Sequence, residues 1–139
     1  IAELELVLKI QYSFKNPNKF KVLKTYIGIE CPLPEIQNEK GSEFICVADN
    51  CSSGDLILIE EIKGTNIKNF DLLILDKTNK FKISASLDNL VYSIDEIISK
   101  TLNIIENYGL PSYKEFFVST GGISENFSLK PHQSLKIKF

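Results

Sequence analysis

The sequence contains no arginine, tryptophan or methionine, and among its 139 residues it has one histidine and three cysteines. Without guanidinium groups, bidentate recognition of phosphates or guanine edges is impossible. The formal net charge of −2 also gives no attraction to a polyanion. An AT-rich coding sequence is the simplest reason for the missing arginine, but the chemical consequence is the same. Composition therefore argues against nucleic-acid binding.

Long hydrophobic runs are missing as well. Residues 56–59 and 72–75 are apolar runs of four residues, whereas a membrane-spanning helix needs ~20. Residues 1–6 alternate charged and apolar side chains, which a secretory signal cannot do. We therefore expect a cytoplasmic protein without a membrane partner. The chain does not start with Met, so a processed terminus and an excised fragment both stay open.

The cysteines predict neither a disulfide framework nor a zinc site. Cys31, Cys46 and Cys51 cannot all pair within one chain, and three thiols suit a reducing compartment. The spacing of Cys46 and Cys51 is wrong for a zinc knuckle, and there is no second histidine to complete four ligands. We expect Cys46 to be a core residue and the other two to be free thiols in loops.

The sequence predicts no catalytic residue and no cofactor. His132 is the only histidine, so a Ser-His-Asp or Cys-His site would have to include it, yet no nucleophile-elbow pattern accompanies it. The seven glycines cannot be arranged into a dinucleotide fingerprint or a phosphate-binding loop. We interpret His132 as an exposed loop residue.

The chain length fits a single domain, residues 1–139, and its apolar fraction of 43% is typical of globular proteins. Apolar residues alternate with polar ones over residues 4–14, which predicts a half-buried strand with Glu3, Glu5 and Lys9 on its polar side. Further strands are predicted over residues 20–29, 44–48, 56–62, 70–75, 81–87 and 135–139. The first two form a hairpin, and lysines protect the last one as an edge strand.

From Leu87 onwards the apolar spacing changes to threes and fours, which predicts a helix. Ser93 and Glu96 have the spacing of a capping box, but the apolar stripe extends upstream of them. We therefore place the N-cap at Asp88 and the helix over residues 89–107. The aromatic spacing in residues 113–117 predicts a second, short helix.

The predicted fold class is thus α+β, with one twisted antiparallel sheet of about five to seven strands packed on one long amphipathic helix in the C-terminal half.

Charge is distributed unevenly along the chain. Residues 30–62 contain eight acidic residues and one basic residue, net −7, whereas the preceding 29 residues carry +3. An acidic surface steers a basic partner towards it. The predicted partner-binding residues are Glu30, Glu35, Glu39, Glu43, Asp49, Asp55 and Tyr92.

Tyr92 is included because a helical wheel places it on the polar face of the predicted helix, where an exposed aromatic residue suits a protein contact. The alternative is that residues 127–129 cover it.

Two segments resemble known families. The predicted helix, the residues Leu110-Pro111-Ser112-Tyr113-Lys114-Glu115-Phe116-Phe117 and the pair Gly121-Gly122 resemble the helix, LP-x-YxxF and GG signature of the SUKH immunity superfamily. This resemblance implies a role in immunity to a toxin.

A second pattern runs through most of the chain. It consists of Ile1-Ala2-Glu3, Tyr26-Ile27-Gly28 followed by Pro32 or Pro34, Cys46, and Leu87-Asp88-Asn89-Leu90. It is similar to a small uncharacterised bacterial family with a strand, an IGxP motif, a core cysteine and a helix, and it implies no activity.

These observations favour a non-catalytic protein-binding domain, an immunity or antitoxin-like protein that neutralises a basic effector. Two alternatives stay open: a small enzyme with a site around His132 or a cysteine, and an accessory domain of a larger assembly.

Overall fold

The computed structural model describes residues 1–12, 20–32, 54–63, 68–75, 80–108 and 115–139. Its elements are the strands β1 (Glu3–Tyr12), β2 (Phe20–Cys31), β3 (Asp55–Glu61), β4 (Asn69–Leu75) and β5 (Lys80–Ser86), the 3-10 turn η2 (Leu87–Asn89), the helix α2 (Ile94–Tyr108), and the strands β6 (Glu115–Gly122) and β7 (Ser134–Lys138).

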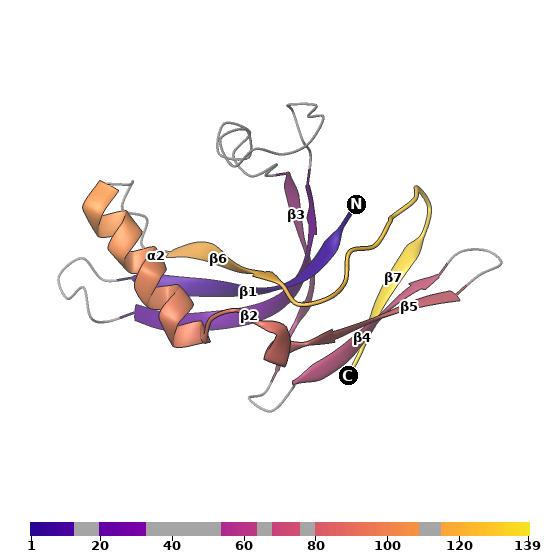
Figure 1. The fold of residues 1–139 in the computed structure, drawn as a ribbon, viewed down its shortest axis with the longest axis horizontal. Helices are drawn as coiled ribbons and strands as arrows, with labels where there is room; N and C mark the ends of the chain where they lie inside the picture. Colours follow the sequence, from indigo (N-terminus) through magenta and orange to yellow (C-terminus); the bar gives the residue numbers. More distant parts are fainter. Residues whose placement is uncertain (13–19, 33–53, 64–67, 76–79, 109–114) are drawn as a thin grey trace.

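The α+β class is confirmed, but the single predicted sheet is wrong. The strands form two antiparallel sheets, one with the order β3-β2-β1-β6 and one with the order β5-β4-β7 (Figure 1). The predicted hairpin is present, with β1 and β2 paired from Glu3↔Glu30 to Tyr12↔Phe20. The predicted strand over residues 44–48 lies outside the described residues.

Strand β6 replaces the short helix predicted over residues 113–117, of which residues 113 and 114 lie outside the described residues. Phe116 and Val118 turn towards the core while Phe117 is half-exposed, as the two-residue period of a strand requires. The spacing of Tyr113, Phe116 and Phe117 suits either a helix or a strand. Here pairing with the edge of β1 opposite β2 makes the segment a strand.

Helix α2 begins five residues later than predicted. The capping box is its true N-terminus, because the Glu96 amide donates to Ser93 Oγ at 3.3 Å and the Ser93 amide donates to Glu96 Oε2 at 2.9 Å. Leu87 and Leu90 pack on the core from the preceding turn, whereas Val91 is 86% exposed. The apolar spacing therefore extends across a chain segment that is not one continuous helix.

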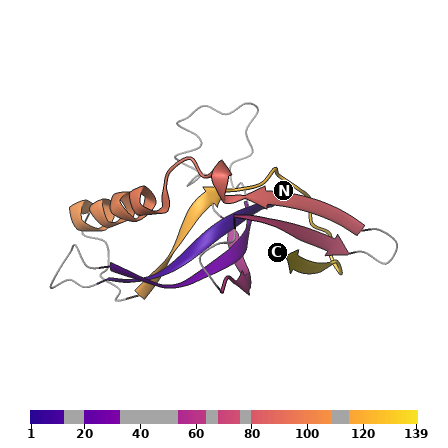
Figure 2. The ribbon, with the colours of Figure 1, turned by 90° about the horizontal axis from the view of Figure 1, so that it is seen from below.

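One apolar core joins both sheets and the helix. Leu4, Leu8, Leu72 and Ile98 belong to the same buried cluster. Helix α2 lies beside the end of β1 that contains Tyr12, whose hydroxyl donates to Glu106 at 2.8 Å. The three-stranded sheet lies beyond the other end of β1 (Figures 1 and 2). Within the described residues, no helix is both long and apolar enough to cross a membrane.

Candidate functional site

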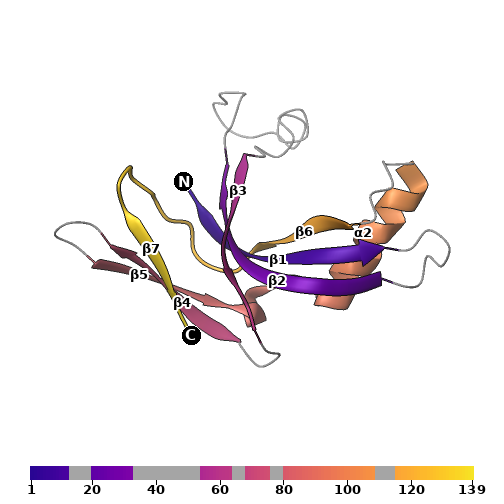
Figure 3. The ribbon, with the colours of Figure 1, turned by 180° about the vertical axis from the view of Figure 1, so that it is seen from behind.

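Strand β1 has a second buried face, which the sequence analysis assigned to solvent. Figure 3 shows the four-stranded sheet from the side away from α2. On the face of β1 opposite the leucine-rich core, Glu5 is 3% exposed and Val7 is 0% exposed. The alternating pattern correctly predicts which residues share a face, but the central part of this face is not open to water.

Two glycines explain this burial. In the sheet register Glu5 lies opposite Gly28 of β2 on one side and Gly122 of β6 on the other. A Cβ atom on Gly28 would lie 2.8 Å from Val7 Cγ2, and a Cβ atom on Gly122 would collide with the carboxylate of Glu3. The side chains of Val7 and Glu3, the neighbours of Glu5 on this face of β1, therefore occupy the space that a side chain at either glycine would need, and the face packs closely on both sides of Glu5.

The strand pairings are irregular on both sides of this point. The register between β1 and β6 shifts between Glu5 and Val7, and Gly121 has a φ of 91°, a conformation that favours glycine. The register between β2 and β3 shifts between Ile27 and Gly28. Bulges of this kind change the direction of side chains and are frequent next to functional sites.

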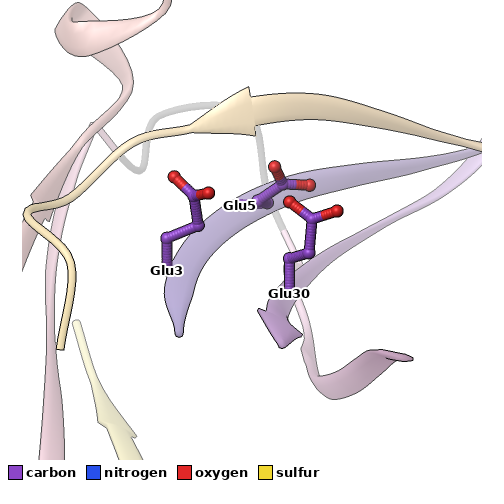
Figure 4. Close-up of side chains that lie close together, drawn as sticks. All are labelled: Glu3, Glu5 and Glu30. Atoms are coloured by element: carbon purple, nitrogen blue, oxygen red, sulfur yellow. The ribbon is translucent and has the colours of Figure 1, made fainter. Parts of the chain in front are cut away.

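Three carboxylates gather around the buried position. Glu3 and Glu5 extend from β1 and Glu30 extends from β2, on the same side of the sheet (Figure 4). One oxygen of each carboxylate lies within 4.8 Å of the others. The Oε2 atom of Glu5 is buried and has no hydrogen-bond partner among the described residues.

Burial and like charge change the acidity of Glu5. Desolvation, the charges of Glu30 and Glu3 and a hydrogen bond to Glu30 together raise its pKa from 4.5 to about 7, with desolvation the largest cause. Near neutral pH Glu5 is therefore divided between its protonated and ionised forms. Chemically, the cluster can hold a proton between carboxylates or bind a cation that prefers oxygen ligands.

The sequence analysis missed this cluster. The predicted hairpin could have placed Glu3 opposite Glu30, but nothing in a strand-period pattern shows that Glu5 is enclosed. Glu5 pairs with Gly122 of β6, and the sequence predicts the first residues of β6, 115–117, as part of a short helix.

The free edge of β3 is the second candidate. Leu56, Ile57 and Leu58 are 39%, 46% and 39% exposed, although they are consecutive apolar residues of one strand. Asp55 and Glu60, at the two ends of this segment, are exposed. In the part of the chain that the structure describes, β3 pairs with β2 only.

The structure describes three of the predicted partner-binding residues, Glu30, Asp55 and Tyr92. Glu30 pairs with Leu56 and Cys31 pairs with Asp55, so Glu30 and Asp55 are one register position apart and their side chains point to opposite faces of the sheet. Glu35, Glu39, Glu43 and Asp49 are outside the described residues.

Tyr92 is separate from these two residues. It precedes α2 instead of lying on it, is 46% exposed, and has Lys100 Nζ 4.1 Å from its ring centroid. Helix α2 covers the opposite face of the sheet from Glu30. Phe127, which was considered as a cover for Tyr92, is buried and pairs with Ala2.

Of the residues of the enzyme alternative, the structure describes His132 and Cys31. His132 is exposed in a turn with a φ of 67°. It lines neither of two hollows on the three-stranded sheet, one beside Phe70 and Asp71 and one beside Ile74 and Phe81. Cys31 is the last residue of β2 and packs half-buried against the core, so its predicted loop position is wrong. Cys46 and Cys51 lie outside the described residues.

No protein-family model matches this chain, and no curated protein is significantly similar to it. The resemblances to the SUKH superfamily and to the small bacterial family therefore stay predictions.

Proposed function

We propose that this chain is a non-catalytic protein-binding protein, of the immunity or antitoxin kind, and that it binds a basic, extended segment of its partner along β3. The observation that carries the proposal is the free edge of β3, where three exposed apolar residues lie between the acidic residues Asp55 and Glu60. An edge strand of this composition offers backbone groups, apolar contacts and charge to an incoming strand.

The other edges of the two sheets support this choice. Edge strands are commonly protected by lysine, which discourages pairing with another chain. Strand β5 contains Lys80 and Lys82, and β7 contains Lys136 and Lys138. Strand β3 contains no lysine. Strand β6, the other edge of the four-stranded sheet, also contains no lysine, but its one acidic residue, Glu115, is paired with Lys9. The edge of β3 is therefore the one that combines the absence of lysine with acidic residues that form no ion pair with a described residue.

The charges along β3 favour a basic partner. Glu61 is paired with Lys24, whose Nζ lies 2.8 Å from Glu61 Oε2, but Asp55 and Glu60 form no ion pair with a described residue. Exposed unpaired charges increase the rate of association with an oppositely charged surface, and salt weakens this effect.

NMR spectroscopy can test the proposal with a defined probe. A synthetic peptide of alternating Lys and Val would be titrated into the isotope-labelled protein, and an equally long peptide of alternating Glu and Val would serve as its control. We expect the Lys peptide to shift the amide resonances of residues 55–61 and the Glu peptide to leave them unchanged. Shifts concentrated on β5 or β7 would contradict the proposal.

Charge-reversal variants sharpen this test. The double substitution Asp55→Lys with Glu60→Lys should weaken binding of the Lys peptide by about tenfold, because it removes the attraction at both ends of the strand. The matched control reverses Lys80 and Lys82 to Glu on β5 and should leave the affinity unchanged or slightly higher. Equal affinities for the wild type and the β3 variant would exclude an electrostatic role for this edge.

A further inference from the structure

When ionised, the carboxylate of Glu5 is a buried charge without a counter-charge in its cluster. Its Oε2 atom is buried, has no hydrogen-bond partner among the described residues, and lies in the cluster that it forms with Glu3 and Glu30 (Figure 4). A buried acceptor without a partner is costly, and a buried charge without a counter-charge is more so. The position is therefore incomplete with the described side chains alone.

The lysines of this face do not complete it. Lys9 Nζ lies 2.7 Å from Glu115 Oε2, and Lys24 Nζ lies 2.8 Å from Glu61 Oε2. Both amino groups are thus engaged by other carboxylates. The charges that act on Glu5 are those of Glu30 and Glu3, which have the same sign as its own.

We propose that Glu3, Glu5 and Glu30 bind one divalent cation, and that Ca²⁺ is the ion that fits. The donors are carboxylate oxygens only, and these are the ligands that hard cations prefer. Zinc and copper sites usually contain nitrogen or sulfur ligands instead. This site is independent of the proposed partner strand, although Glu30 lies next to β3.

Coordination preferences favour Ca²⁺ over Mg²⁺. The ligand oxygens lie within 4.8 Å of one another, which is close enough for three ligands to converge on one ion. Ca²⁺ accepts carboxylate oxygens at about 2.3–2.6 Å in flexible geometries. Mg²⁺ requires a nearly ideal octahedron at about 2.0–2.1 Å and gives up its water reluctantly.

The glycines give the site its shape and provide an independent way to disturb it. Glu3 lies over Gly122, where a Cβ atom would meet its carboxylate. Gly122 does not have a positive φ, so alanine is compatible with its backbone. The substitution Gly122→Ala therefore displaces the Glu3 carboxylate while all three acidic side chains remain present.

Isothermal titration of the chelator-treated protein with CaCl₂ tests the proposal. We expect one Ca²⁺ per chain and a rise in the melting temperature with Ca²⁺ concentration, because an ion that binds only the folded state stabilises it. Glu5→Gln and Glu30→Gln should each weaken Ca²⁺ binding by about tenfold or more, since affinity depends on the number of charged ligands. Gly122→Ala should also weaken it.

Glu60→Gln is the matched control, because it makes the same substitution on an exposed position of the same sheet. It should leave Ca²⁺ affinity within about twofold of the wild type. Since Gln at position 5 removes a buried charge, we expect this variant to fold, and its circular dichroism spectrum checks that it does.

Three results would overturn the proposal. One is the absence of heat and of a melting-temperature shift at ~10 mM Ca²⁺, tenfold above the weakest class of protein calcium sites. Another is equal Ca²⁺ affinity in the wild type and the folded Glu5→Gln variant. A third is tighter binding of Mg²⁺ than of Ca²⁺, which would leave a cation site but exclude the assigned ion.

Discussion

The two faces of β1 are both buried in the middle of the strand but are chemically opposite. On the α2 side, Leu4 and Leu8 are surrounded by apolar side chains of both sheets and the helix. On the other side, Glu5 is enclosed by glycines and two further carboxylates. Apolar burial stabilises the fold, whereas burial of Glu5 opposes it. A position that weakens the fold in this way is where a binding function is expected.

Truncation on the α2 side should have the largest effect on stability. Ile98 is 1% exposed, so Ile98→Ala should lower the free energy of unfolding by ~2–5 kcal/mol through lost burial and a residual cavity. Ile104 of the same helix is 50% exposed, and Ile104→Ala should cost far less. Urea denaturation of both variants measures the difference. A loss below about 0.5 kcal/mol for Ile98→Ala would show that the apolar face of α2 is wrongly oriented.

Neutralising the carboxylate face should instead stabilise the protein. The pKa of Glu5 is about 7 in the folded state and near 4.5 in the unfolded chain, so the folded state binds more protons between these pH values. This group therefore makes the wild type progressively less stable as the pH rises from about 4.5 to about 7. Above that window Glu5→Gln should be more stable than the wild type by roughly 1–3 kcal/mol.

The corresponding measurement is denaturation of both proteins from pH 4 to pH 8 in the presence of a chelator. The difference between them should appear within the stated pH window and remain constant above it. Glu60→Gln, at an exposed position, should follow the wild-type profile. Parallel profiles for the wild type and Glu5→Gln would show that Glu5 titrates as an ordinary exposed carboxylate.

The ion pair between Lys9 and Glu115, at the margin of the carboxylate face of β1, should contribute least to the free energy of unfolding. Lys9 and Glu115 have side chains that are 29% and 43% exposed, and solvent screens their interaction. A double-mutant cycle with Lys9→Ala and Glu115→Ala should give a coupling energy of ~0.2–1 kcal/mol that decreases at high salt. A coupling above about 2 kcal/mol would mean that the outer face is more shielded from water than its exposure indicates.

The sequence predicts secondary structure well where the spacing of the apolar residues fits only one period, either that of a strand or that of a helix. The alternation in β1, β5 and β7 identifies these strands, because their apolar residues recur with the two-residue period only. The prediction fails for residues 115–117, because the spacing of Tyr113, Phe116 and Phe117 suits a helix as well as a strand and long-range pairing with β1 makes the choice. It also extends the helix upstream of Ser93, because Leu87 and Leu90 reach the core from outside α2.

The candidate sites, like the secondary structure, can be predicted from the sequence only in part. Acidic composition pointed to Glu30 and Asp55, and the structure places these residues on β2 and β3 with their side chains on opposite faces of the sheet. The carboxylate cluster could not be predicted in this way, since it requires Glu5 to be enclosed by Gly122, which is 117 positions away in the sequence. Burial of a polar residue is a property of the assembled sheet and not of its own strand.

The order of the strands has a consequence for synthesis on the ribosome. The hairpin of β1 and β2 and its neighbour β3 can pair as they emerge, but the four-stranded sheet waits for β6 and the three-stranded sheet waits for β7. The Leu4 amide and Ser124 Oγ, which bond at 3.2 Å, are 120 positions apart. Closing such a loop is entropically costly and slows folding. Until β6 arrives, the nascent chain exposes the unpaired edge of β1 and leaves the Glu5 carboxylate hydrated, so the carboxylate cluster, which the β1–β2 hairpin assembles, is buried only when the sheet closes.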